Sequence, residues 1–460
     1  MKKLYILIAA LACFSFAAAQ KQQAPAGGTP KDFKLPSKKQ GKLNNGMGYS
    51  LVQYGAIPKV NINLIIKTGN VHEGPDQIWL GDLTGQMMEQ GTTSMDFASI
   101  SKKVAGMGGN ITLNVGMDQV NINGAVLSEF APQLIRVIAD VVMNPAFPEK
   151  EVERLKADLK RQLSVQRSVP QSLAQEKFFG TIYPDHPYGR YFPTEKMLES
   201  YTLASVKEFY DKNFGAKRSV MYVVGKFNED SVAQAIDKAF SIWKEGPAID
   251  YPLATPVKSN NIAMIDRPAA PQSTIMLGIP VPDPSQADFQ ALQTTNSLLG
   301  GSFGSRITSN IREDKGFTYS PFSTIQSRHR VAVWYEQADV TSEFTSASLQ
   351  EISKEIKRLQ TEPPSREELS GIQNYEAGIF VLQNSTPGGI INQLNFIDQH
   401  GLDDSYLTNK VKNIYAVTPE KVSEITRQYF KYEDMTLVMV GDKKLLEKQM
   451  REAKNTLKAK

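Results

Sequence analysis

The chain has almost no cysteine and little histidine. Its 460 residues include one cysteine, Cys13, and four histidines. Cys13 lies in the first apolar stretch, so the rest of the chain can form neither a disulfide nor a cysteine-ligated metal site, which suits an oxidising compartment. The histidines are His72, His186, His329 and His400, and no two are close enough in sequence to form a local metal-binding pair.

Positive and negative residues are nearly balanced, and long apolar runs are missing. The chain holds 52 Lys and Arg against 48 Asp and Glu, whereas a nucleic-acid-binding protein usually carries a clustered basic face. We therefore expect no nucleic-acid partner. Spanning a bilayer takes about 18 apolar residues, and no uninterrupted run of that length follows the first apolar stretch, so we also expect no membrane span. The composition is that of a globular protein, and the length exceeds what one hydrophobic core usually supports.

The first residues predict a secretory signal peptide. Met-Lys-Lys is followed by an apolar run from Leu4 to Phe16 and by Ala-Ala-Ala before Gln20, which are the positive, apolar and cleavage regions of such a peptide. Acylation of Cys13 is disfavoured by the bulky Leu11 two positions before it. We assign residues 1–19 to the signal peptide and expect a mature protein that is free in the periplasm or secreted.

The remainder is an internal duplication. Thr202 matches Thr418, Val206 matches Val422, Phe214 matches Phe430 and Gly225 matches Gly441, and the same interval separates every pair. This register predicts two copies of one module of roughly 200 residues. We place a flexible leader at 20–32, the modules at 33–245 and 262–460, and a Pro/Gly-containing linker at 246–261.

Each module is expected to be an α+β unit, with a mostly antiparallel sheet and helices on one face. Asn45-Gly46 predicts a hairpin turn, and residues 60–67 alternate between apolar and polar as a strand does. Residues 130–143 and 346–359 have the apolar period of matching amphipathic helices.

Two motifs link the chain to a known family. LLGGSFGSRI, from Leu298 to Ile307, and IREDKGFTY, from Ile311 to Tyr319, closely resemble the substrate-gripping signature in the C-terminal half of pitrilysin/insulinase-type zinc peptidases. The resemblance runs from Phe33 to the C-terminus. It implies that the two modules pair as a clam-like half-chamber.

The metal half of that family's site is degenerate. The inverted zinc motif H-x-x-E-H, aligned on Gly91-Thr92, falls on Asp82, Gly85 and Gln86, and the distal glutamate ligand falls near Gln162. Zinc hydrolysis needs three protein ligands and a base for the bound water. Asp82 alone can ligate a metal, the glutamines are poor ligands, and Gly85 cannot act as a base. We expect no metal in this chain.

The substrate half is retained. In the family, the resemblance implies that an arginine and a tyrosine at the spacing of Arg312 and Tyr319 donate hydrogen bonds to peptide carbonyls near the scissile bond. Gly316 allows a tight turn that brings both side chains to one cavity, and Arg306 is expected to form a structural salt bridge or a helix cap. The segment before Val115 resembles the family's edge strand, on which a substrate adds as a further strand.

Three functions follow from this half-site. The first is a zinc-free, non-catalytic subunit that contributes peptide binding and transition-state contacts to a homologous partner, which would carry zinc and H-x-x-E-H. The second is a peptide-binding or assembly protein without a proteolytic partner. The third is a stand-alone hydrolase with an unrecognised site. Unfolded peptides are the expected substrates of the first.

Overall fold

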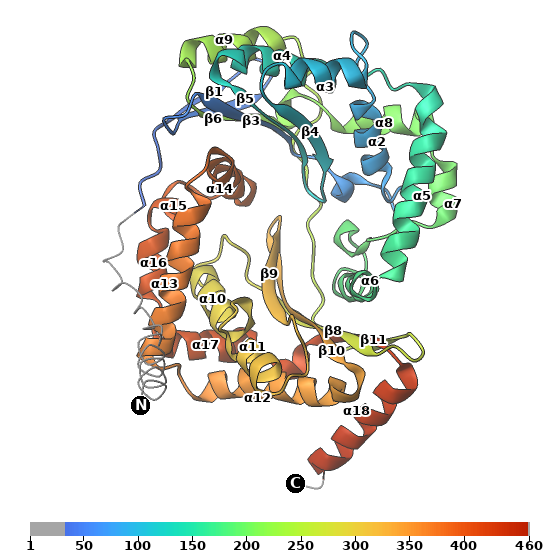
Figure 1. The fold of residues 1–460 in the computed structure, drawn as a ribbon, viewed down its shortest axis with the longest axis vertical. Coiled ribbons are helices and arrows are strands. Elements are labelled where there is room, and N and C mark those ends of the chain that lie inside the picture. Colours follow the sequence, from blue (N-terminus) through green and yellow to red (C-terminus); the bar gives the residue numbers. More distant parts are fainter. Residues whose placement is uncertain (1–32, 459–460) are drawn as a thin grey trace, which may run out of the picture. The chain divides into compact units, whose positions relative to one another are not determined.

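The computed structural model describes residues 33–458. The predicted signal peptide at 1–19 and the predicted leader at 20–32 lie outside the described residues. Two sheets, each with its own helices, form the architecture (Figure 1).

The first sheet has six strands in the order β1-β2-β6-β3-β5-β4. Neighbours are antiparallel except β2 and β6, which are parallel. The predicted hairpin at Asn45-Gly46 is confirmed, because it joins β1 to β2 and Gly46 has φ +94°. The strands are β1 Lys38–Lys42, β2 Gly48–Gln53, β3 Lys59–Ile66, β4 Asn110–Val115, β5 Val120–Leu127 and β6 Ser219–Gly225.

Helices cover one face of this sheet through a continuous apolar core. Ile62 and Leu64 of β3 are buried in the same cluster as Leu134 and Ile138 of α4, on the helix that the apolar period predicts. The helices of this half are α2 Leu80–Glu89, α3 Phe97–Ala105, α4 Ala131–Met143, α5 Val152–Ser168, α6 Pro170–Ile182, α7 Glu195–Ser200, α8 Leu203–Asn213 and α9 Glu229–Phe240.

The second sheet repeats the first without an equivalent of β1. Its order is β7-β11-β8-β10-β9, and only β7 and β11 are parallel. The strands are β7 Ile262–Asp266, β8 Gln272–Val281, β9 Phe322–Arg328, β10 Val331–Thr341 and β11 Thr436–Gly441. The predicted fold class, α+β with two homologous modules of mostly antiparallel sheet, is confirmed.

The helices of the second half come in an order similar to that of the first half, and two π-helical turns are inserted among them. The α-helices are α10 Phe289–Asn296, α11 Arg306–Thr308, α12 Thr345–Thr361, α13 Arg366–Gln383, α14 Pro387–His400, α15 Ser405–Thr408, α16 Lys410–Ala416, α17 Pro419–Tyr429 and α18 Lys443–Lys458. The π-helical turns are η6 Ser297–Gly301 and η7 Ser309–Asp314. π-Helical turns are rare in proteins, and those that do occur are often found at functional sites.

Each half lends one helix to the other half's sheet. Helix α6 packs on β8 and β11, and the ring of its Phe178 lies 6.0 Å from that of Tyr335 on β10. Helix α14 packs on β3 and β6, where Ile390 and Ile65 share a buried cluster. The sheet face opposite each module's own helices is therefore covered by the other module, an exchange that the sequence pattern does not predict.

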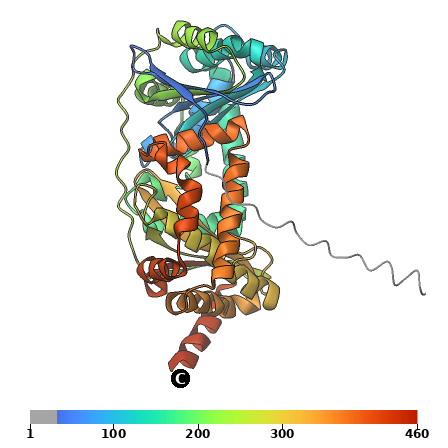
Figure 2. The same ribbon diagram turned by 90° about the vertical axis from the view of Figure 1, so that its left-hand side faces the viewer.

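Polar contacts complete this junction. Gln119 and Asn395 exchange two amide hydrogen bonds of 3.1 and 2.9 Å, and the Lys67 ammonium lies 2.9 Å from the Asp398 carboxylate. Between α9 and β7 the chain runs without helix or strand, as Figure 2 shows. None of the helices within the described residues has the length and apolarity that crossing a membrane requires.

Candidate functional site

The degenerate zinc motif lies on α2. Asp82, Gly85 and Gln86 occupy one turn of this helix, so the spacing assumed from the sequence is helical. The Oδ2 atom of Asp82 accepts a hydrogen bond of 2.7 Å from the side-chain amide of Asn70. Burial raises the pKa of Asp82.

A second carboxylate, which the sequence reasoning missed, lies beside Asp82. Glu73 is buried, and its carboxylate accepts hydrogen bonds from the backbone amides of Gly81 at 2.7 Å and Trp79 at 3.1 Å. Asn70 donates to it at 2.9 Å as well. Burial, followed by the charge of Asp82, raises the pKa of Glu73 to about 8. Glu73 thus binds amides at the N-terminus of α2 that have no partner within the helix, and it serves the helix rather than a ligand.

Strand β4 fills the space beside Gly85. A Cβ atom on Gly85 would lie 2.5 Å from Val115 Cγ2 and 2.9 Å from Leu113 Cδ2. Real Cβ contacts are longer than 3.0 Å, so a side chain fits here only if the side chains of Val115 and Leu113 shift. Packing against β4 therefore disfavours a base at the position that carries it in the family.

The distal position offers nothing to complete a metal site. Gln162 is exposed on α5. The nearby Asp158 pairs with Arg154 at 3.0 Å and also with Arg161. Across residues 33–458, no three His, Cys, Asp or Glu side chains gather as metal ligands would. The residues at these positions do not fit the family's zinc ion, since they supply one carboxylate, no imidazole and no base.

The retained motif forms a stack of three side chains. The guanidinium carbon of Arg312 lies 4.3 Å from the centroid of the Phe303 ring and 5.0 Å from that of Tyr319. The two rings are 70% and 78% exposed. Aromatic faces attract a guanidinium and fix its plane. The Nε atom of Arg312 also lies 3.3 Å from the Glu313 carboxylate, so Arg312 presents its remaining N–H groups in a set orientation at the protein surface.

The turn at Gly316 brings Arg312 and Tyr319 together. Gly316 has φ +63°, a left-handed conformation that favours glycine. Its amide donates to the Arg312 carbonyl at 3.1 Å, which closes the turn after η7. Arg312 and Tyr319 meet as predicted, but Tyr319 faces solvent and not an enclosed cavity, because nothing within residues 33–458 covers it.

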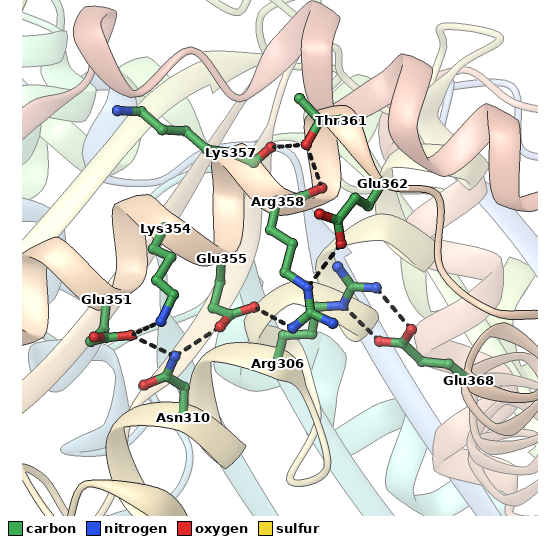
Figure 3. Close-up of polar contacts among 10 residues, drawn as sticks. All are labelled: Arg306, Asn310, Glu351, Lys354, Glu355, Lys357, Arg358, Thr361, Glu362 and Glu368. Carbon is green, nitrogen blue, oxygen red and sulfur yellow. Dashed lines mark hydrogen bonds and ion pairs between the residues drawn. The ribbon is translucent and has the colours of Figure 1, made fainter.

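Polar contacts of Arg306 and Asn310, two residues near the stack in sequence, tie this segment to neighbouring helices (Figure 3). Arg306 donates to both carboxylate oxygens of Glu368 at 2.7 and 2.8 Å, which confirms the predicted structural salt bridge. Asn310 donates to Glu351 at 2.9 Å and to the buried Glu355 at 2.8 Å. These contacts fix α11 and η7 against α12 and α13, so the exposed stack stands on a rigid base.

Two features border the site. Strand β4 is the edge of the first sheet, as the resemblance implies. His186 is buried: its ring accepts a hydrogen bond from the Tyr188 amide at 3.1 Å and lies 3.0 Å from the Pro252 carbonyl. Its role is structural, because it contacts the segment that connects the modules.

Comparisons with known proteins agree with this arrangement. Residues 52–192 match the sequence model described as insulinase, peptidase family M16, and residues 200–375 match the one described as the peptidase M16 inactive domain. The chain belongs to the insulinase family, M16. Because H-x-x-E-H does not occur anywhere in its sequence, it is a member of that family without the zinc motif.

Individual M16 relatives cover most of the chain. An uncharacterized zinc protease of Rickettsia felis is 25% identical over 330 residues, covering 71% of this chain and 79% of the relative. A non-peptidase homolog of Helicobacter pylori, YmxG, is 21% identical over 399 residues, covering 84% and 90%. The solved peptidase M16 inactive domain from Pseudomonas fluorescens has a TM-score of 0.80 at 23% identity, covering 88% of this chain and 98% of its own. That structure shares the fold.

Sequence reasoning missed Phe303 and Glu73 for different reasons. Phe303 lies within the quoted motif, but a single aromatic among glycines and serines gives no periodic signal. Glu73 is expected at the surface from its residue type, because glutamate is rarely buried. No local signal marks it, because Glu73 lies six residues before Trp79, the N-cap of α2, and the usual capping residue is the N-cap itself.

Proposed function

We propose that this chain is the zinc-free, non-hydrolytic subunit of a two-chain M16 peptidase. It contributes substrate contacts to a homologous partner that carries zinc and H-x-x-E-H. The observation that carries the proposal is the exposed Phe303–Arg312–Tyr319 stack. It is rigidly held, although the described residues form no metal site beside it.

The chemistry of the stack suits a contact made to a site on another chain. A guanidinium and a phenol are donors that stabilise the oxyanion of a tetrahedral intermediate, and the effect is large where water is excluded. In the isolated chain Tyr319 is 78% exposed, so water surrounds it. A partner that covers the stack would exclude that water and supply the reacting bond.

The closed position at Gly85 supports the absence of hydrolysis by this chain. A base at position 85 would have to displace the side chains of Val115 and Leu113, which lie 2.5 and 2.9 Å from a Cβ atom placed there, and Asp82 is hydrogen-bonded to Asn70. The name of the Helicobacter pylori relative, a non-peptidase homolog, is in line with this. The signal peptide predicted at residues 1–19 supports a periplasmic location for this chain, so cell fractionation is expected to recover the mature protein there, beginning at Gln20.

The test is reconstitution with the zinc-bearing homologue from the same organism. Each mature chain is assayed alone and in a mixture, with a quenched unstructured peptide as substrate. The expected result is background hydrolysis by this chain alone and, in the mixture, activity that o-phenanthroline abolishes. Hydrolysis by this chain alone that resists the chelator would instead establish a stand-alone hydrolase.

Variants of the stack test its role in the mixture. Arg312→Ala and Tyr319→Phe should lower turnover by up to about 10²–10³, the usual cost of removing one oxyanion donor, while the chains still associate. Arg312→Lys should not restore the rate, because lysine lacks the planar fork. Lys315→Ala, which removes a positive charge from the same exposed turn, is the matched control and should leave the rate unchanged.

Two outcomes would remove the proposal. Wild-type kinetics in both Arg312→Ala and Tyr319→Phe would make the pair a packing feature. Failure of this chain to associate with any zinc-bearing homologue, tested by affinity capture from the periplasm, would favour the second function, a peptide-binding or assembly protein without a proteolytic partner.

A further inference from the structure

All four histidines of the chain lie at the junction between the two modules. His72 and His186 come from two short 3₁₀ turns of the first module, and His329 comes from the turn between β9 and β10. His400 is the last residue of α14, near enough to His329 for their charges to interact. These residues are far apart in sequence, so the fold alone gathers them, and the proposed function uses none of them.

Two of the histidines bind the connection between α9 and β7. The Nε2 atom of His72 lies 2.6 Å from the Asp250 carbonyl, and that of His186 lies 3.0 Å from the Pro252 carbonyl. The Nδ1 atom of each ring accepts a hydrogen bond from a backbone amide, at 3.4 Å for His72 and 3.1 Å for His186. A neutral imidazole has one donor and one acceptor nitrogen. Both rings therefore fit this arrangement in the neutral form, with the proton on Nε2.

Tyr251, between those two carbonyls in sequence, contacts histidines of both modules. Its ring stacks on that of His329, with 4.6 Å between the centroids and 25° between the planes, and it lies 5.7 Å from the ring of His72. Its hydroxyl donates to the Asp118 carbonyl at 3.0 Å. Residues 250–252 belong to no helix or strand, so these side-chain contacts hold them in place.

Protonation would disturb each of these rings, because a charged imidazole is a donor at both nitrogens. In His186 the new N–H group would face the N–H group of the Tyr188 backbone. His72 is more tolerant, since the Thr68 hydroxyl lies 3.3 Å from its Nδ1 atom and can accept. His329 and His400 each have a buried Nδ1 atom without a hydrogen-bond partner within residues 33–458. A proton there would place an unpaired charge in a buried site.

The surroundings favour the neutral form of all four rings. Burial lowers the pKa of each histidine from the ordinary 6.5, that of His400 to about 4. Three arginines near the rings act in the same direction and three carboxylates oppose them, and these are Arg190, Arg218, Arg330, Asp118, Asp250 and Asp283. The charge of Asp118 is partly compensated by Arg328 at 3.7 Å. Because the released rings bind protons more strongly, the held arrangement is fully stable above pH 6.5 and loses stability as the pH falls toward 4.

We propose that His72, His186 and His329 form an acid-sensitive clasp, which holds residues 250–252 at neutral pH and releases them when the imidazoles are protonated. Histidine is the side chain whose charge ordinarily changes between pH 5 and 8. His400 strengthens the response, because its charge repels a proton on His329. The clasp makes the junction of the modules sensitive to acid. It needs neither zinc nor a partner chain, so it stands or falls separately from the peptidase role.

The experiment follows a nitroxide spin label beside the clasp by electron paramagnetic resonance. The only cysteine is Cys13, so a chain produced from Gln20 onward has no thiol and takes one label at Leu253→Cys, a position that is 77% exposed. The mobile fraction of this label should rise at least about threefold between pH 7.5 and 4.5, with a midpoint below 6.5. A label at Val165→Cys on α5, where the side chain is 60% exposed, is the matched control and should not change.

Two results with the labelled chains would overturn the clasp. The first is a Leu253→Cys label whose mobility stays constant over this range of pH. The second is an equal rise of mobility at both labels together with loss of the helical circular dichroism signal, because that is unfolding of the whole chain by acid.

Variants separate the histidines from the carboxylates around them. Glutamine has an amide that can donate as Nε2 does but does not titrate, so His72→Gln, His186→Gln and His329→Gln combined should abolish the pH dependence at the label. His400→Gln removes an imidazole that does not contact residues 250–252 and should leave a transition. A transition that persists in the triple variant would assign it to the nearby carboxylates and overturn the proposal.

A measurement on the wild-type chain needs no variant to fold. Histidine-specific ¹³C labelling gives four imidazole signals, one for each histidine, and nuclear magnetic resonance follows their titration. Those of the three clasp histidines should titrate below pH 6.5, together with the change in label mobility. Titration of His186 at or above its ordinary value would show that the fold does not favour the neutral ring, and the clasp would be refuted.

Discussion

Replacing Gly85 with alanine tests whether the degenerate motif on α2 is closed. The added methyl group would lie 2.5 Å from Val115 Cγ2 and 2.9 Å from Leu113 Cδ2. Overpacking of this kind costs about 1–3 kcal/mol, and β-branched Val115 has few alternative rotamers. Alanine also favours a helix over glycine by about 1 kcal/mol. The net expectation is that Gly85→Ala lowers the free energy of unfolding by up to about 2 kcal/mol.

Gly371 provides the matched control. It also lies inside a helix, α13, but a Cβ atom there would meet nothing within 4 Å. Gly371→Ala should therefore gain up to about 1 kcal/mol from helix propensity alone. Urea denaturation followed by circular dichroism measures both variants, and unchanged m-values would show that the unfolded state is unaffected. Equal stabilisation by the two substitutions would mean that β4 moves aside easily, and the closed site would be refuted.

The same packing argument applies to a variant in which the zinc motif on α2 is restored. Asp82→His, Gly85→Glu and Gln86→His combined recreate H-x-x-E-H, but the glutamate would have to displace the side chains of Val115 and Leu113 on β4. We expect no stoichiometric zinc by elemental analysis and a protein less stable than the Gly85→Ala variant.

Two further predictions concern charged side chains. Glu336 on β10 is fully buried, with no hydrogen-bond partner for its carboxylate within the described chain, and burial raises its pKa well above the ordinary 4.5. Folding therefore takes up a proton above pH 4.5, so this group lowers the free energy of unfolding as the pH rises. Glu336→Gln should lose that slope between pH 5 and 8 in urea titrations, and an unchanged slope would contradict the prediction. Arg306→Ala should cost about 1–2 kcal/mol, because it removes the bidentate partner of Glu368, whose side chain is 34% exposed. The exposed Arg366→Ala should change stability by less than about 0.5 kcal/mol, and equal melting temperatures for the two variants would show that the Arg306 pair is not stabilising.

Local sequence signals predicted most of the fold. The Asn45-Gly46 turn identifies a hairpin by itself, and the repeated register from Thr202 and Thr418 to Gly225 and Gly441 predicts two similar modules, which the two matching sheet orders confirm. The exchange of α6 and α14 was not predictable in this way. An apolar period shows that a helix face is buried, but it does not show which sheet buries Phe178.

The candidate site was predictable only in part. The positions of Asp82, Gly85 and Gln86 on one helix follow from their spacing, and the approach of Arg312 to Tyr319 follows from the glycine turn between them. Closure of the site does not follow from these residues, because it depends on side chains of β4, a distant strand. Phe303 completes the stack by proximity in space, which no pattern in the sequence encodes.

The exchange of α6 and α14 has a consequence for how the protein unfolds. Either half alone would expose the buried faces that the other half's helix now covers, so neither is expected to be stable after separation. The two halves should therefore melt in a single cooperative transition, even though the chain is long enough for two independent ones. A cut in the connection between α9 and β7 should leave the two fragments bound to each other under native conditions.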